Sequence, residues 1–412
     1  MAKFPSDRFP PGFFDLPSDA GEVLPLELIE RWTHSPQTRD VAHELLAPRT
    51  LTGTVVSSDS AGLTRLSRER SLVEILAMVN RPKEIVHAYG TAIGGRTIGV
   101  WAADNTQMFY PADVPAERVV GMLRGLLERL PSESEVGIGL CAHRGVFFEL
   151  SGGLYGPDAD RVEVVAEEHT AGSELLITDV LADRLPTGHG FVLEPRADLL
   201  EHFGAVFRVT GGPALTDLAA TDFRYPAPFS DDFYSQLSAY GRTRRDSVVP
   251  HPVYQDRTVV LIEREREELD IPEVAVLNDL ALSAAMKRIG NALLRGFPGV
   301  EIKTSGLIAL YVFDDAATGT GFARAFRDAF AEQGVATRTG LDAGPVLVFE
   351  LGRGTRDIAG SPVNVASKLA QDCGSFGSIY LSEAVAAKLP GTPPGRAVEF
   401  AVSGITLSVR EL

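Results

Sequence analysis

The chain has 412 residues, and its 55 acidic and 39 basic residues give a formal net charge of −16. A surface this acidic repels polyanions, which excludes a nucleic acid polymer and an anionic membrane as expected partners. No apolar run approaches the roughly 20 residues that span a bilayer, so membrane insertion is not expected. The two cysteines, Cys141 and Cys373, are far apart and lack metal-ligand spacing, which predicts reduced thiols in a cytoplasmic protein.

Residues 1–50 form a predicted N-terminal arm whose start is rich in Pro and Phe, where neither a signal peptide nor regular structure is expected. Its early phenylalanines would be costly to leave in water. We therefore expect the arm to pack either on its own chain or on a neighbouring subunit, so a homo-oligomer formed through the arm is one of two alternatives. The phenylalanines are Phe4, Phe9, Phe13 and Phe14.

Residues 51–211 alternate between strand and helix patterns, which is typical of an α+β domain. A strand at 51–58 leads through a turn with Gly62 into a helical pattern that begins near Leu72. The stretch 85–93 is interpreted as the first arm of a hairpin, and 95–112 as the second. The elements expected after the hairpin are a helix at 118–130, strands at 136–143 and 146–150, a second helix, a strand at 174–178 and a closing strand at 203–211.

Residues 212–255 have proline and polar punctuation without a sustained period, which indicates a linker with a short helix at 231–240. From residue 256 to the end at 412 the first pattern returns. An offset of 203 to 204 residues aligns Asp104 with Leu307, Asp160 with Asn364 and Leu185 with Leu389. The chain is therefore predicted to be a tandem duplication. Two similar units most simply pair about a pseudo-two-fold axis, which would place a site at their interface.

The first repeat carries two carboxylates where a metal site would need them. Asp59 ends the first strand, and Asp104 lies in the hairpin that is expected to pair beside it. Oxygen ligands of this kind suit Mg²⁺ or Mn²⁺, with phosphate oxygens completing the shell. The turn after Asp59 offers backbone N–H groups to a phosphate. Taken singly, either aspartate is equally well explained as turn chemistry or a helix cap.

The second repeat carries a different set of polar residues: Lys303, Asp357, Asn364 and Lys368. Asn364 and Lys368 are four residues apart and are expected on one face of a helix. Leu307 replaces Asp104, and the strand expected to match 55–59 shows no obvious partner for Asp59. Each of these polar residues could also be an ordinary surface residue. The complementary split of acids and bases between the repeats is what favours a function.

These segments resemble the class III nucleotidyl cyclases. VVSSDSAGLTRLS is similar to the strand and turn that open with a metal aspartate, and AADNTQMFY to the hairpin with the second one. IKTSGLIAL resembles the Lys-Thr-x-Gly hairpin of adenylyl cyclases. RDIAGSPVNVASKLAQ is very close to the Asp-x-x-Gly-x-x-Val-Asn-x-Ala-Ser-Arg helix of the family. The resemblance covers most of residues 52–211 and 256–412.

The resemblance implies an α+β fold of two ferredoxin-like (βαββαβ) cyclase homology domains in tandem, which form an intramolecular pseudo-heterodimer. It divides the chain into an arm (1–50), a metal-binding domain (51–211), a linker (212–255) and an adenine-binding domain (256–412). It implies adenylyl cyclase activity on ATP with two Mg²⁺ or Mn²⁺ ions, at one site composed from both halves.

The resemblance also assigns roles to individual residues. Asp59 and Asp104 would hold the metals. Lys303 would donate to adenine N1, and Asp357 would accept from the N6 amino group. Asn364 would position the ribose, and Lys368 would stabilise transition-state charge. The implied phosphate loop comprises Ser60, Ala61, Gly62, Leu63 and Thr64.

Three positions depart from the family pattern at groups that handle phosphate charge. Lys368 stands where the family has Arg, Val146 where an Arg is common, and Ile405 where a phosphate-binding Lys is expected. Lysine carries a point charge where arginine presents a planar guanidinium, and valine and isoleucine carry no charge. These departures predict low or conditional activity. The alternative function is a pseudo-cyclase that binds a nucleotide and acts as a regulatory or assembly module. A guanylyl cyclase is disfavoured by the pair Lys303 and Asp357.

Overall fold

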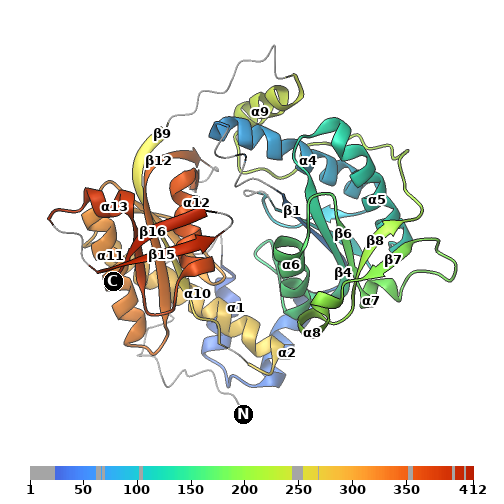
Figure 1. The fold of residues 1–412 in the computed structure, drawn as a ribbon. Coiled ribbons are helices and arrows are strands. Elements are labelled where there is room, and N and C mark those ends of the chain that lie inside the picture. Colours follow the sequence, from blue (N-terminus) through green and yellow to red (C-terminus); the bar gives the residue numbers. More distant parts are fainter. Residues whose placement is uncertain are drawn as a thin grey trace. The chain divides into compact units, whose positions relative to one another are not determined.

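The computed structural model describes residues 24–61, 66, 70–101, 105–243, 254–267, 269–350, 356–391, 395–402 and 405–412. The chain divides into two compact units, Arg49–His251 and Met1–Pro48 with Pro252–Leu412 (Figure 1). The four phenylalanines of the arm lie outside the described residues. No helix in the described ranges is long and apolar enough to cross a membrane.

The unit Arg49–His251 contains an eight-stranded mixed sheet in the order β2-β3-β1-β4-β6-β8-β7, with β5 paired to β4. Its strands are β1 (Thr50–Ser60), β2 (Arg96–Thr97), β3 (Thr106–Pro111), β4 (Ile138–Leu150), β5 (Gly153–Tyr155), β6 (Leu175–Thr178), β7 (Val192–Pro195) and β8 (Val206–Gly211). Its helices are α4 (Leu72–Ala92), α5 (Ala116–Glu133), α6 (Pro157–His169), α7 (Asp179–Ala182), η4 (Ala197–Leu199), α8 (Leu200–Phe203) and α9 (Asp231–Thr243).

Side-chain alternation along the strands gives this sheet two buried faces. Val55 of β1 belongs to a core cluster with Val162 and Ala166 of α6. Met108 and Tyr110 of β3 lie against Gly90 of α4 on the other face. The helix α6 therefore covers one face of the sheet and α4 covers the other.

The second unit repeats this order strand for strand, as β10-β11-β9-β12-β14-β16-β15 with β13 paired to β12, which confirms the predicted duplication and the α+β class. Its strands are β9 (Tyr254–Arg264), β10 (Val300–Ser305), β11 (Ile308–Phe313), β12 (Thr337–Glu350), β13 (Arg356–Ala359), β14 (Ile379–Ser382), β15 (Arg396–Val402) and β16 (Ile405–Glu411). Its helices are α1 (Leu26–Thr33), α2 (Arg39–Leu46), η3 (Ala47–Arg49, at the boundary), α10 (Pro272–Leu294), α11 (Ala316–Ala331), α12 (Ser361–Ser367), η5 (Lys368–Cys373) and α13 (Glu383–Lys388).

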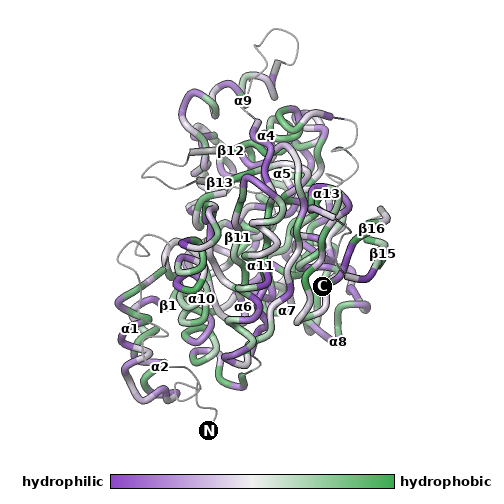
Figure 2. Tube along the Cα trace, turned by 90° about the vertical axis from the view of Figure 1, so that its left-hand side faces the viewer, coloured by the Kyte–Doolittle hydropathy of each residue, from purple (hydrophilic) through white to green (hydrophobic). Residues whose placement is uncertain are grey.

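The same layering holds in the second unit. Tyr311 of β11 packs on Phe322 of α11, with ring centroids 4.6 Å apart. On the other face Leu310 joins a core cluster with Ala366 of α12. Figure 2 shows the alternation of hydrophilic and hydrophobic residues along surface helices, α11 among them.

The interpretation of residues 85–93 as a hairpin strand was wrong, because α4 runs unbroken from Leu72 to Ala92. A capping box between Ser71 and Glu74 starts the helix. Residues 82–90 are all buried, so the segment lacks the one-sided pattern that marks a surface helix. The equivalent helix of the second repeat, α10, is likewise buried without interruption along residues 280–286.

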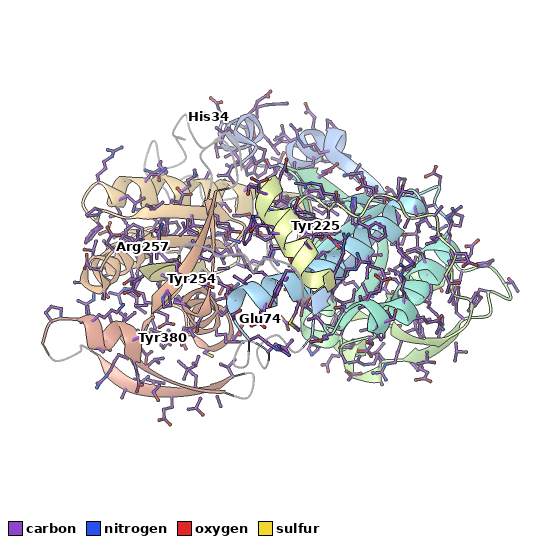
Figure 3. The ribbon with its side chains drawn as sticks, turned by 90° about the horizontal axis from the view of Figure 1, so that it is seen from above. His34, Glu74, Tyr225, Tyr254, Arg257 and Tyr380 are labelled. Carbon is purple, nitrogen blue, oxygen red and sulfur yellow. The ribbon has the colours of Figure 1, made fainter. Side chains whose placement is uncertain are left out.

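A flanking segment packs on each repeat. The arm precedes the first repeat but packs on the second, and the linker precedes the second repeat but packs on the first. The helix α1 contacts α10, and Trp32 donates to Asn278 Oδ1 at 3.0 Å. The linker helix α9 packs on α4, and the linker residue Tyr225 donates to Asn80 Oδ1 at 2.7 Å (Figure 3). Asn80 of α4 and Asn278 of α10 are both buried. The two units therefore use one docking scheme, an aromatic donor on a buried asparagine.

Replacing Tyr225 with phenylalanine is expected to lower the free energy of unfolding by about 1–3 kcal/mol, because the buried oxygen of Asn80 loses its donor. Urea unfolding followed by far-UV circular dichroism measures this. Tyr254→Phe is the control, since Tyr254 is 45% exposed. Equal stability of the two variants would show that the Tyr225 hydroxyl adds nothing.

Candidate functional site

Asp59 lies next to last in β1, directly opposite Gly139 of β4. The neighbouring pair of β1 and β3 ends at Ser58 and Thr106, whose buried hydroxyl groups are 2.6 Å apart. Asp59 itself is half-buried and has polar interactions of its own. The strand end predicted for this aspartate is therefore present, and the predicted pairing of the hairpin beside it is observed.

The rest of the predicted metal and phosphate region is described only in part. Ser60 ends β1, and the N–H of Ala61 donates to Gly137 O at 2.9 Å. Asp104, Gly62, Leu63 and Thr64 lie outside the described residues. In the ranges that the structure describes, no group of three or more His, Cys, Asp or Glu residues could hold a metal ion. The oxygen chemistry of Asp59 fits a hard divalent cation.

A β-bulge sets the direction of Lys303 in β10. Glu301 pairs with Tyr311 and Lys303 pairs with Leu310, so Ile302 is the extra residue. Directly opposed residues of an antiparallel pair share a face. Lys303 therefore lies on the α12 face with Leu310, whereas regular alternation after the buried Ile302 would place it on the α10 face. The Lys303 residue is exposed.

Asp357 lies in β13, the short strand that pairs with the end of β12 and contacts β10. Its Oδ1 accepts a hydrogen bond from the N–H of Ile358 at 2.8 Å. The chain then turns into α12 at Gly360, whose φ of 149° and close approach to Pro345 O disfavour any side chain. This turn fixes the short path from Asp357 to Asn364.

Asn364 is exposed on α12, and its carbonyl accepts from the N–H of Lys368. The two residues are therefore one helical turn apart, as predicted. The helix does not continue regularly, however, because Lys368 opens a π-helical turn, η5. Its ammonium group lies 3.7 Å from the carboxylate of Asp372. Short π-helical turns are frequent at functional sites.

Each of the four polar residues of the second repeat lies within two positions in sequence of a member of one apolar cluster. Ile302, Ile358 and Ala366 all belong to it, and each is a near neighbour in sequence of a predicted site residue. The segments that carry Lys303, Asp357, Asn364 and Lys368 therefore pack on a common core within one unit, although Asp357 alternates with the buried Ile358 along β13 and so lies on the other face of that strand. No ion pair links Lys303 to Asp357 among the described residues.

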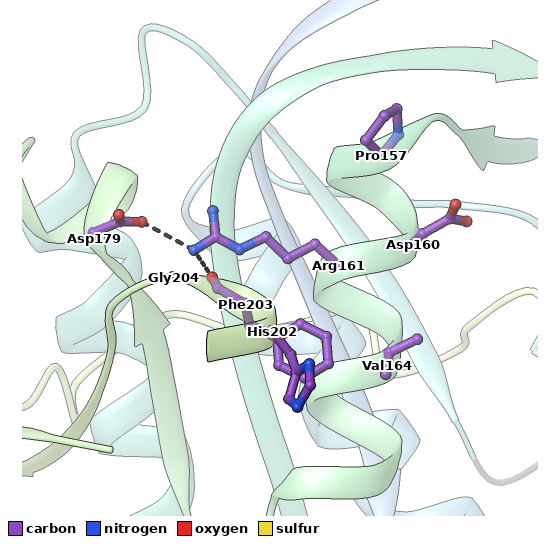
Figure 4. Close-up of a pocket in the computed structure, with 8 residues that line it drawn as sticks. All are labelled: Pro157, Asp160, Arg161, Val164, Asp179, His202, Phe203 and Gly204. Carbon is purple, nitrogen blue, oxygen red and sulfur yellow. Dashed lines mark hydrogen bonds and ion pairs between the residues drawn. The ribbon is translucent and has the colours of Figure 1, made fainter. Parts of the chain in front are cut away.

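The matching face of the first repeat lines a cavity of about 560 Å³ (Figure 4). Asp160 and Val164, which stand in the places of Asn364 and Lys368, line it. Arg161 closes one side by donating to Asp179 at 3.1 Å and to the carbonyl of Phe203. The helix face of the first repeat thus has no base at the position of Lys368.

Two of the positions that depart from the cyclase pattern are ordinary parts of the sheets. Ile405 begins β16. Val146 is 45% exposed, and its N–H donates to Asp158 at 2.7 Å. Burial would raise the pKa of Asp158, but hydrogen bonds from His143 and the Val146 amide hold it below its usual value. The Asp158 carboxylate thus ties α6 to β4, and neither position supplies a cation.

The expectation that the second repeat has no acid at the position of Asp59 was wrong. Glu263 of β9 pairs with Arg338 of β12 in the same register as Asp59 with Gly139. Arg338 Nε donates to Glu263 Oε2 at 2.6 Å, so this acid is already neutralised. Aligning the strands of the two repeats residue by residue would have identified Glu263, but nothing in the sequence pairs it with Arg338.

No protein-family model matches the sequence, and no curated protein is significantly similar to it. A class III adenylyl cyclase-like ATP-binding protein from Pseudomonas aeruginosa matches in structure over 82% of this chain and 85% of its own, with a TM-score of 0.55 and 11% identity. The fold is that of the class III cyclases.

Single cyclase domains match over less of the chain. The adenylyl cyclase CyaB from P. aeruginosa covers 40% of this chain and 96% of its own, with a TM-score of 0.34 and 18% identity. The guanylyl cyclase Cya2 covers 39% and 92%, with a TM-score of 0.33 and 13% identity. The long match, over 82% of this chain, spans both repeats of the fold.

Proposed function

We propose that the chain is an adenylyl cyclase, which converts ATP to 3′,5′-cyclic AMP and pyrophosphate. The first repeat supplies the metal-binding carboxylates, and the second supplies the groups that bind adenine and ribose at the same nucleotide. The observation that carries this proposal is the common core on which the segments with Lys303, Asp357, Asn364 and Lys368 pack. In particular, the bulge at Ile302 places Lys303 on the face of the sheet that carries α12.

Each of these side chains has a chemical task in the proposal. The Lys303 ammonium donates to adenine N1, and the Asp357 carboxylate accepts from the N6 amino group. Asn364 holds the ribose so that its 3′-hydroxyl reaches the α-phosphate. Lys368 stabilises the negative charge that spreads over the phosphate oxygens as the bond to pyrophosphate breaks. Two Mg²⁺ or Mn²⁺ ions on Asp59 and Asp104 would supply Lewis-acid chemistry for this step.

A pseudo-cyclase that binds ATP without turnover is the second candidate. It is favoured by Lys368 in place of the planar guanidinium of arginine and by the valine and isoleucine at positions 146 and 405. The long structural match to an ATP-binding cyclase-like protein also supports nucleotide binding before turnover. Both candidates share the adenine-binding groups, so the base specificity can be tested separately from catalysis.

The double variant Lys303→Glu with Asp357→Asn is expected to shift the ratio of ATP to GTP affinity by about 100-fold toward GTP. Guanine presents a donor at N1 and an acceptor at O6, and each lost or gained polar contact is worth about 1–3 kcal/mol. Calorimetry with α,β-methylene analogues of ATP and GTP, at fixed Mg²⁺, measures the two affinities without turnover.

Arg324→Glu is the control for this experiment, because it reverses a charge on an exposed position of α11. It should leave both affinities unchanged. An unchanged ratio in the double variant would show that Lys303 and Asp357 do not read the base. No binding of either nucleotide to the wild-type chain would overturn both candidate functions.

A further inference from the structure

Arg338 of β12 connects three parts of the second repeat. Its Nε donates to Glu263 Oε2 at 2.6 Å, its Nη1 to Gly374 O at 2.9 Å and its Nη2 to Gln371 O at 2.5 Å. The guanidinium carbon lies 4.8 Å from the centre of the Phe376 ring. The N–H groups of the planar guanidinium thus bind a carboxylate and two backbone carbonyls, and its face packs on an aromatic ring.

The two carbonyls belong to the irregular turn that carries Lys368. The π-helical turn η5 runs from Lys368 to Cys373; Gln371 lies inside it, and Gly374 caps its end. A π-helical turn widens the helix and leaves terminal carbonyls without partners in its own segment. Arg338 satisfies two of these carbonyls, so its side chain stabilises the irregular geometry.

The first repeat shows what the same place looks like without the arginine. Gly139 takes the position of Arg338, and a Cβ built there would lie 1.9 Å from Thr170 Oγ1. The helix α6 accordingly continues as a regular α-helix to His169, with no π-helical turn. A side chain at this strand position and a π-helical turn in the following helix therefore occur together in one repeat and are both missing from the other.

We propose that Arg338, held by Glu263, is a positioning residue for Lys368. The ion pair occupies the strand position where the first repeat carries Asp59, so the second repeat uses this acid to orient an arginine. Arginine fixed in this way holds the turn that begins at Lys368 and so sets the direction of the Lys368 ammonium group. This inference rests on the proposed cyclase function, because it assigns Lys368 to the reaction.

Arg338→Lys tests the inference. Lysine can still pair with Glu263, but it cannot bind both carbonyls at once. We expect a kcat for cAMP formation that is about 10- to 100-fold lower, with the KM for ATP within about twofold of wild type. We also expect faster hydrogen exchange of the backbone amides in 368–374. Glu263→Gln keeps the size of the side chain. It should also lower kcat and speed up the hydrogen exchange of 368–374, by less than Arg338→Lys does.

Arg396→Lys is the matched control, since Arg396 forms an exposed ion pair with Glu411 in the same unit. It should alter neither kcat nor the exchange in 368–374. Unchanged exchange in Arg338→Lys would overturn the inference, whatever the activity. Faster exchange with an unchanged kcat would show a purely structural role and would also overturn it. A wild-type chain that makes no cAMP contradicts the proposed function instead, and exchange then decides alone whether Arg338 holds the turn.

Discussion

Replacing Asp59 with asparagine is expected to lower cAMP formation by at least about 100-fold in Mg²⁺ or Mn²⁺. Asparagine keeps the shape of the side chain but removes the charge that a divalent cation needs. Because Asp59 is half-buried at the end of β1, the isosteric change should leave the fold in place. A coupled assay for pyrophosphate together with thermal unfolding separates the loss of activity from a loss of folded protein.

Asp113→Asn serves as the control for this variant. Asp113 is an exposed carboxylate just after β3 in the same unit, and no role is assigned to it. Its substitution should leave activity unchanged. If Asp59→Asn retained wild-type activity, the first repeat would not supply the metal-binding carboxylate that the proposed mechanism needs.

The largest effect on stability is expected for Asp279→Ala. Arg264 is fully buried in the second unit and donates to Asp279 Oδ1 at 2.7 Å. Burial lowers the pKa of Arg264, and the carboxylate of Asp279 opposes that shift. Removing the carboxylate leaves a buried guanidinium without its counter-charge, which costs about 3–5 kcal/mol in the free energy of unfolding. Chemical denaturation of the whole chain measures the change.

Asp256→Ala is the exposed counterpart. Asp256 pairs with Lys388 at 2.9 Å, but its side chain is 69% exposed. An exposed pair of this kind contributes about 0–1 kcal/mol. The account requires Asp279→Ala to lose much more stability than Asp256→Ala, because Arg264 is buried and its ion pair is costly to break. Comparable losses in the two variants would contradict it.

The duplication and the elements of the second repeat could be predicted because strand and helix periods are local properties of the sequence. The helix over residues 85–93 could not, since α4 is buried on nearly all sides there and its pattern resembles that of a buried strand. The helix α10 of the second repeat is buried in the same way along residues 280–286, so neither half marks this helix by a one-sided pattern.

The candidate site, too, could be predicted from the sequence only in part. Residue types and spacing indicated Lys303, Asp357, Asn364 and Lys368, and the segments that carry them pack on one apolar core. The bulge at Ile302 and the π-helical turn at Lys368 depend on tertiary contacts and leave no local signal. The pair of Glu263 and Arg338 is 75 residues apart in sequence, so only the pairing of β9 with β12 brings it together.

The central claim is turnover of ATP by a chain with two unequal cyclase repeats. Its most direct test is the amount of cAMP and pyrophosphate formed by the purified protein from ATP, with Mg²⁺ and separately with Mn²⁺. The account predicts equal amounts of both products, at a low rate, and at least about 100-fold less of both in Asp59→Asn. Saturable ATP binding with no cAMP under either metal would contradict it and would establish the nucleotide-binding pseudo-cyclase instead.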